Sequence, residues 1–103
     1  MLIVRLRAEH DIAEAGLWYE SRRPGAGLYF IHCVDAAISL ITRHPEAGPV
    51  QFGPFRRVLV PRLPFAVFYT IEPGKVIVHG VFHSSKAPEG IRELLESGSD
   101  ESQ

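Results

Sequence analysis

Residues 56–86 contain the side-chain types that metal-free RNA cleavage requires. Such a reaction uses a base for the 2′-hydroxyl, cations that stabilise the phosphorane and an acid for the leaving group. The candidates for these roles are His83, Arg57, Arg62 and Lys86. Each also has a simpler interpretation, because a histidine near a strand end is often structural and a basic residue in a loop is often solvated. The sequence therefore leaves both a catalytic and a structural role open for these residues.

Arg56, Arg62 and Trp18 are candidates for contact with a protein partner. Arg56 and Arg57 are adjacent in a predicted strand, so their side chains point to opposite faces and only one of them can line a given site. Arg62 lies in a predicted turn, where it is exposed and suited to an acidic partner. Trp18 lies beside the buried stripe of a predicted helix, so it belongs either to the core or to a binding surface.

The remaining residues whose side chains could bind a metal ion or react predict neither a metal ion nor a cofactor. The other histidines lack the spacing of a metal site: His10, His32, His44 and His79. Cys33 stands among apolar residues in a predicted helix and is interpreted as a small core residue rather than a nucleophile. Gly25 and Gly27 follow a helix instead of a strand, which does not support a phosphate-binding loop.

Three strands are predicted to position these residues: 58–60, 65–71 and 76–82. They are rich in β-branched and aromatic residues, which suit a pleated and half-buried surface. Pro73 followed by Gly74 favours a type II turn between the last two strands. Strands this close in sequence are expected to pair as an antiparallel meander.

The chain before the meander is predicted to cover one face of it. Residues 2–7 alternate in polarity and predict a first strand at a sheet edge. Residues 11–23 predict a helix, with Asp11 and Glu14 as its capping box. Among the residues of the predicted elements, seven are expected to be largely buried: Ile12, Val34, Ile38, Val67, Tyr69, Ile77 and Val81.

A second helix is predicted over residues 28–44, ending before Pro45. The short connection between the two helices indicates an antiparallel helical hairpin. Residues 46–54 are interpreted as a loop and residues 89–97 as a short third helix. The predicted class is therefore α+β, in the order β-α-α-β-β-β(-α), with the hairpin packed on one face of a roughly four-stranded, mainly antiparallel sheet.

Length and composition indicate one cytoplasmic domain. The 103 residues suffice for a single core, which we expect over residues 1–97, followed by a disordered acidic tail of residues 98–103. No apolar run reaches the length of a membrane span, and one cysteine agrees with a reducing compartment. The net charge is −1, but four of the twelve acidic residues lie in the last eleven positions, which leaves a mildly basic body.

Several short motifs follow one another in a recognisable order. In the predicted hairpin they are Asp11-Ile12-x-Glu14-Ala15, Trp18-Tyr19, Pro24-Gly25-x-Gly27-x-x-Phe30, Val34-Asp35-x-Ala37 and His44-Pro45. In the predicted sheet they are Arg56-Arg57, Arg62-Leu63-Pro64-Phe65 with Tyr69, and Val81-x-His83-x-x-Lys86-x-Pro88. Together, over about residues 2–88, they resemble the RelE/ParE superfamily of toxins from type II toxin–antitoxin modules.

This resemblance implies a small cytoplasmic toxin that inhibits growth and is neutralised by a cognate antitoxin, through a segment that folds on binding. It implies contact with DNA only through the antitoxin complex, and no membrane partner. RelE-like members of the superfamily cut mRNA on the ribosome, whereas ParE-like members poison DNA gyrase.

Two features favour the ParE-like branch. The segment Leu63-Pro64-Phe65 looks closer to it, and Ala66 stands where RelE-like nucleases tend to have a catalytic arginine. We therefore expect a toxin that inhibits a protein target such as DNA gyrase. The alternatives are a ribosome-dependent mRNA endoribonuclease, or a degenerate module that binds its antitoxin without toxicity.

Overall fold

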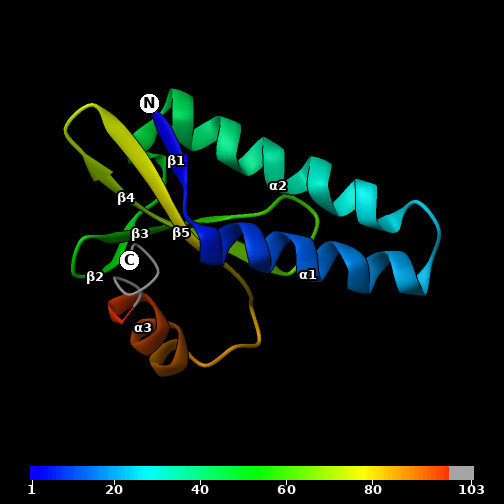
Figure 1. Cartoon of the computed structure of the whole chain (residues 1–103). Helices are drawn as coiled ribbons and strands as arrows, with labels where there is room; N and C mark the ends of the chain where they lie inside the picture. The colour runs from blue at the N-terminus through cyan, green and yellow to red at the C-terminus, as the bar shows by residue number, and fades with distance from the viewer. Residues whose placement is uncertain (98–103) are drawn as a thin grey trace.

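The computed structural model describes residues 1–97, and its elements follow the predicted order (Figure 1). They are β1 (Leu2–Val4), α1 (Leu6–Arg22), α2 (Ala26–Arg43), the 3-10 helix η1 (Pro45–Ala47), β2 (Val50–Phe52), β3 (Phe55–Leu59), β4 (Phe65–Glu72), β5 (Lys75–His83) and α3 (Pro88–Glu96). The strands form one sheet in the order β1-β5-β4-β3-β2. The predicted α+β class is confirmed. The predicted tail of residues 98–103 lies outside the described residues, and a single domain ending at residue 97 stays a prediction.

The sheet contains the predicted meander. β3 pairs with β4 and β4 with β5, both antiparallel. Gly74 has a φ of 73° in the turn between β4 and β5, which is the positive value that the third residue of a type II turn requires. β1 lies at one edge of the sheet, as predicted, and runs parallel to β5.

Two local predictions were wrong. The loop expected over residues 46–54 contains η1 and the edge strand β2, which makes the sheet five-stranded. The first helix begins at Leu6, so Asp11 lies inside it and caps nothing. The helix starts early because the backbone N–H of Arg5 donates to Val78 O at 2.9 Å, which ends the pairing of β1, and Glu9 N then donates to Arg5 O at 3.0 Å.

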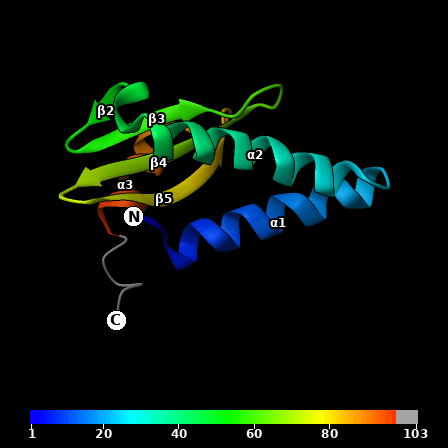
Figure 2. The same ribbon diagram turned by 90° about the horizontal axis from the view of Figure 1, so that it is seen from above.

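The helices cover opposite faces of the sheet. α1 and α2 pack on one face, where the larger core includes Phe30, Val34, Val67 and Tyr69 (Figure 2). α3 packs on the other face, over a smaller and largely aromatic core that includes Phe68 and Phe82. Of the seven residues expected to be buried, five are buried and two, Ile12 and Ile38, are partly buried against the larger core.

α2 is, by length and composition alone, apolar enough to cross a membrane, contrary to the expectation from the sequence. Its apolar stripe is occupied, however, since Phe30, Val34 and Ile41 are fully buried against the sheet. A helix buried in a protein core can have the same length and hydropathy, and α2 packs as such a core helix does.

Candidate functional site

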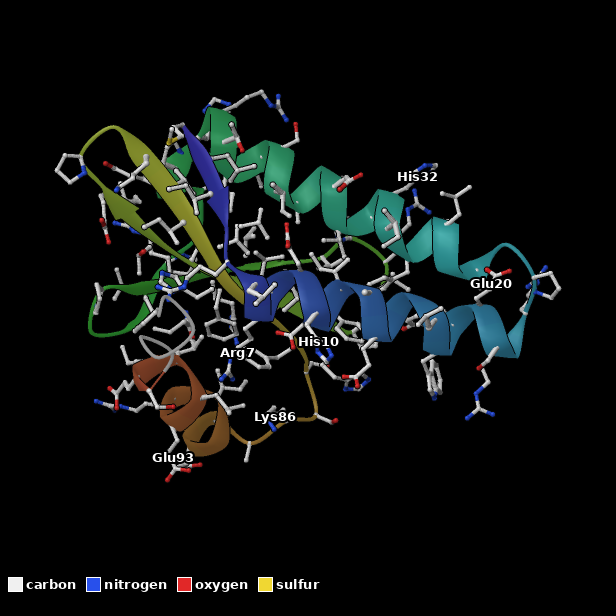
Figure 3. The ribbon with its side chains drawn as sticks, viewed as in Figure 1. Arg7, His10, Glu20, His32, Lys86 and Glu93 are labelled. Carbon is white, nitrogen blue, oxygen red and sulfur yellow. The ribbon has the colours of Figure 1, made fainter. Side chains whose placement is uncertain are left out.

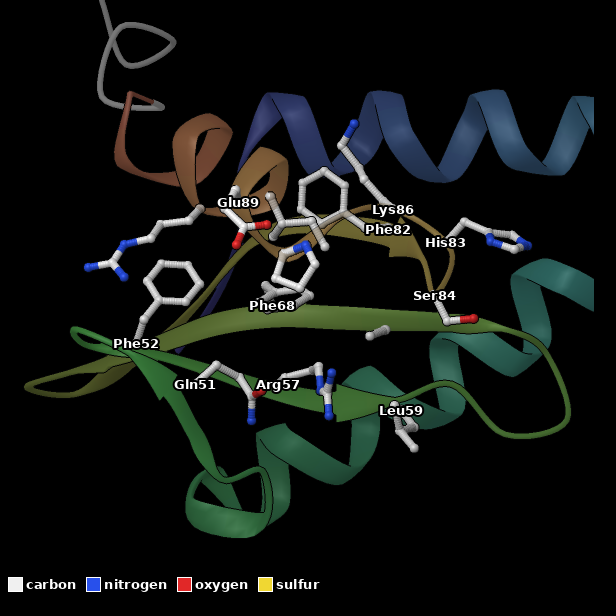
Figure 4. A pocket seen from close by; sticks show the side chains of 14 residues that line it. Gln51, Phe52, Arg57, Leu59, Phe68, Phe82, His83, Ser84, Lys86 and Glu89 are labelled. Atoms are coloured by element: carbon white, nitrogen blue, oxygen red, sulfur yellow. The ribbon is translucent and has the colours of Figure 1, made fainter.

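A groove lies between α3 and the sheet face that α3 covers (Figure 4). Its volume is about 350 Å³, and its walls come from β2, β3, β4, the end of β5 and α3. Ala66, Phe68 and Phe82 form an apolar floor, and Arg57, Lys86 and Arg92 provide cations around it. We call this hollow the α3 groove. Its volume is at the lower end of the range typical of ligand sites.

The strand register explains why Arg57 lines the groove and Arg56 does not. Arg57 pairs with Phe68, which faces α3, whereas Arg56 pairs with Tyr69, which faces the helical hairpin. Arg56 instead donates from Nη1 to Gly48 O at 2.9 Å. The two arginines therefore lie on opposite faces, as their adjacency predicts, and Arg56 holds the chain before β2 in place.

His83 lies at the end of β5, with its ring edge-on to Phe65 at a centroid distance of 5.1 Å. Its Nδ1 accepts a hydrogen bond from the backbone N–H of Ser85 at 3.0 Å. This bond engages the lone pair of Nδ1, so the neutral ring carries its proton on Nε2. In this arrangement neither ring nitrogen offers a free lone pair to a substrate hydroxyl.

A second hollow of about 580 Å³ opens on the other side of His83 and Lys86, between α1 and the loop that leads into α3. Figure 3 shows Lys86 on this loop, across from α1. Asp11 and Trp18 line the hollow from the α1 side. His83 and Lys86 therefore border both hollows.

Asp11 joins α1 to β5 beneath this second hollow. Its Oδ2 accepts a hydrogen bond from the backbone N–H of Val81 at 3.0 Å. Val81 comes just after an irregularity in the pairing of β5 with β4. Phe68 pairs with Gly80, but the next residue, Tyr69, pairs with Val78, so the register shifts at this point. Burial raises the pKa of Asp11 above its ordinary value, although the Val81 hydrogen bond and the Arg7 charge act in the opposite direction.

Besides Arg56, two predicted candidates lie outside the α3 groove. Arg62 is exposed in the β3–β4 connection, with a left-handed φ of 67°. Trp18 is 53% exposed on α1, and the Arg22 guanidinium lies 4.6 Å from its ring centroid. Of the residues predicted for catalysis, the structure thus brings together Arg57, His83 and Lys86, but not Arg62.

Arg92 and Leu59 line the groove and were not among the site residues predicted from the sequence. Arg92, on α3, places its guanidinium 5.2 Å from the ring centroid of Phe52, and Leu59, on β3, is 63% exposed beside Ala66. The amphipathic pattern of Ile91, Leu94 and Leu95 was the available signal, since it requires α3 to cover an apolar surface.

The other predictions concern metals and thiols. Within residues 1–97, no three His, Cys, Asp or Glu side chains come together as a metal site would require. Cys33 is buried in α2 and belongs to the larger core, in agreement with its interpretation as a core residue.

Residues 2–88 match the family described as the ParE toxin of the type II toxin–antitoxin system parDE. The chain is also similar to a chain in the solved structure of the chromosomal ParDE TA system from P. aeruginosa, with a TM-score of 0.71 and 15% sequence identity, over 80% of this chain and 92% of that chain. At this identity the likeness concerns the fold alone. No curated protein matches the sequence significantly.

Proposed function

We propose that this chain, which belongs to the ParE toxin family of type II toxin–antitoxin systems, acts in the cytoplasm by binding and inhibiting a protein target such as DNA gyrase. A cognate antitoxin neutralises it through a segment that folds on binding, and the toxin meets DNA only through the antitoxin complex. It uses no cofactor and performs no chemistry of its own.

The observation that carries this proposal is the apolar centre of the α3 groove. Ala66 lies on the floor there, 5% exposed, opposite Phe82 in the β4–β5 ladder. A methyl group cannot stabilise the charge that develops on a phosphorane, and losing one such group commonly costs about a hundredfold or more in rate. The surrounding cations stand on three separate parts of the chain: β3, the loop after β5, and α3.

The hydrogen bonding of His83 supports the same conclusion. A general base must present a free lone pair to the hydroxyl that it deprotonates. The Nδ1 lone pair of His83 is engaged by the Ser85 N–H, and Nε2 carries the remaining proton of the neutral ring. His83 is therefore better suited to donate a hydrogen bond from Nε2 than to act as a base.

An exposed apolar surface on the helical hairpin fits the antitoxin. Leu17, Trp18 and Leu28 are 72%, 53% and 61% exposed. Tryptophan and arginine are enriched among residues that dominate binding energy, and here Trp18 carries Arg22 against its ring. These exposed side chains offer an amphipathic segment of a partner apolar area to bury on the hairpin.

One observation favours the endoribonuclease as a second candidate. Arg57, His83 and Lys86 border the same groove, so one hollow has a cation and two groups able to donate a proton among its lining residues. The degenerate module without toxicity is the third alternative.

Expression of the toxin without its antitoxin separates these functions. The 5′ ends of translated mRNA would be mapped within minutes of induction, while purified gyrase is assayed for supercoiling and for trapped cleavage complexes. We expect impaired gyrase and intact mRNA. Rapid codon-phased cuts that vanish in His83→Ala or Arg57→Ala, with gyrase unaffected, would overturn the proposal. The absence of both effects would indicate the degenerate module.

A further inference from the structure

We infer that the α3 groove is the docking site for an acidic segment of the toxin's protein target, with one large apolar side chain of that segment inserted above Ala66. The inference rests on the proposed function and specifies which surface of the toxin contacts the target.

The space for an inserted side chain lies over a small residue on the groove face. Ala66 lies opposite Phe82 in the ladder, so only a methyl group projects from β4 at this point. Gly80 lets the Phe82 ring pack over β5, because a Cβ at residue 80 would lie 2.6 Å from that ring. Ala66 and Phe82 both line the hollow of about 350 Å³ between the sheet and α3.

The surroundings of this space suit an apolar anchor. Leu59 pairs with Ala66 and is 63% exposed, and Phe52 and Ile91 line the same groove. A large aliphatic side chain that stays exposed beside a hollow is typical of a binding surface. Burying it under a partner side chain removes apolar area of both molecules from water.

The basic side chains around the groove favour a segment with acidic residues. Arg57, Lys86 and Arg92 line the groove, and Glu89 is the only acidic side chain among the lining residues that the structure describes. Arg92 is paired with Glu96 on α3, with Nε 3.1 Å from Oε2, so Arg57 and Lys86 carry most of the attraction for an acidic segment. Opposite charges across an interface accelerate association and exclude wrong partners. A segment with acidic residues on either side of its apolar anchor matches this arrangement.

Two observations favour the target over other occupants. Leu17, Trp18 and Leu28 lie on the hairpin and are not among the residues that line the groove, so an antitoxin segment confined to them leaves the groove open. Nucleic acid is disfavoured because Phe68 and Phe82 are 4% and 7% exposed and present no open ring face for base stacking.

Three substitutions in the groove test the inference. Ala66→Leu fills the space, Arg57→Glu reverses one rim charge, and Leu59→Ser removes the exposed apolar contact without disturbing the core. Arg23→Glu, an equal charge reversal at the exposed end of the hairpin, is the matched control. We expect each groove variant, at unchanged melting temperature, to inhibit gyrase supercoiling with a half-inhibitory concentration raised about tenfold or more, and the control to behave as wild type.

The outcomes separate this inference from the proposed function. Inhibition of gyrase by wild type and by all three groove variants alike would overturn the inference and leave the proposed function standing. Groove variants that keep inhibiting gyrase but lose the antitoxin would assign the groove to the antitoxin instead.

If wild type does not act on gyrase, the proposed target is wrong, and the groove is tested by selection of phage-displayed random peptides on the purified toxin. Enrichment of acidic peptides with a single leucine or aromatic residue, whose binding Arg57→Glu and Leu59→Ser abolish and Arg23→Glu does not, would support the inference. Enriched peptides without acidic residues, or peptides indifferent to the groove variants, would overturn it.

Discussion

Tyr69→Phe is expected to destabilise the protein strongly although it removes a single oxygen atom. The Tyr69 side chain is fully buried, and its hydroxyl donates to Pro45 O at 2.6 Å and accepts from Gly48 N at 2.9 Å. These bonds tie β4 to η1 and to the chain that enters β2. Phenylalanine keeps the packing of the ring but leaves both backbone groups without this partner.

The cost follows from the burial of those groups. Each hydrogen bond contributes about 0.5–1.5 kcal/mol net, and leaving a buried donor such as the Gly48 N–H without an acceptor costs about 1–3 kcal/mol. Gly48 is buried, so water does not readily replace the hydroxyl. We therefore expect the free energy of unfolding to fall by about 2–4 kcal/mol. For a domain of this size the melting temperature would then fall by roughly 8–30 °C.

Urea unfolding followed by circular dichroism measures this loss, with Tyr29→Phe as the control. Tyr29 is 48% exposed on α2, so its hydroxyl is accessible to water and its removal should change stability little. A loss below about 0.5 kcal/mol in Tyr69→Phe would refute the reasoning, because it would mean that the two backbone groups find other partners at no cost.

Three further predictions concern Asp11, Arg62 and Trp18. Because burial raises the pKa of Asp11 above its ordinary value of 3.8, the native state holds this proton more tightly than the unfolded chain. The stability of wild type relative to Asp11→Asn should therefore increase as the pH falls from neutral toward 3.8, in urea unfolding at a series of pH values; a decrease would show that the Val81 hydrogen bond and Arg7 outweigh burial. Arg62→Gly should raise the free energy of unfolding by about 0.5–1 kcal/mol over Arg62→Ala, because glycine adopts the φ of 67° without strain, and equal stability of the two variants would contradict this. Trp18→Ala should weaken antitoxin binding about tenfold or more with little loss of stability, and an unchanged dissociation constant in biolayer interferometry would exclude Trp18 from the interface.

The meander and both long helices could be predicted because their signals are local. β-branched and aromatic residues identify β4 and β5, and Pro45 marks the end of α2. β2 could not be predicted, because three residues between Pro49 and Pro54 have no periodic pattern and become a strand only by pairing with β3. Such an edge strand forms only through tertiary contacts.

The start of α1 was misplaced for a related reason. Leu6 is 68% exposed, and Ala8 is the only residue of the first helical turns that is fully buried, so the apolar stripe is not visible there. The acidic residue at position 11 suggested a cap. Its carboxylate instead bonds to Val81, seventy residues later, which no local pattern can reveal.

The candidate site was predictable only where local strand patterns determine which face a side chain occupies. Alternation along a strand separates Arg56 from Arg57, and the pairing of β3 with β4 places Arg57 on the groove face beside Phe68. His83 pairs with Phe65, which packs against the larger core, so His83 borders the groove only from the end of β5. Arg92 joins them only because α3 covers the face that the hairpin leaves open. The Ser85 N–H bond to His83 depends on the loop conformation and has no signal in the sequence.

The two faces of β4 differ in how much room they leave for a substitution. Val67 and Tyr69 point into the larger core beneath the hairpin, where a change of volume is costly. Ala66 points toward the groove, which has α3 on one side and free volume on the other. Ala66 is itself buried in the smaller core, but it borders this free volume, so a larger side chain at position 66 has room on the groove side that Val67 and Tyr69 lack. In this chain the alanine leaves an apolar hollow with basic side chains around it, and under the proposed function that hollow would receive a protein segment rather than a reacting phosphate.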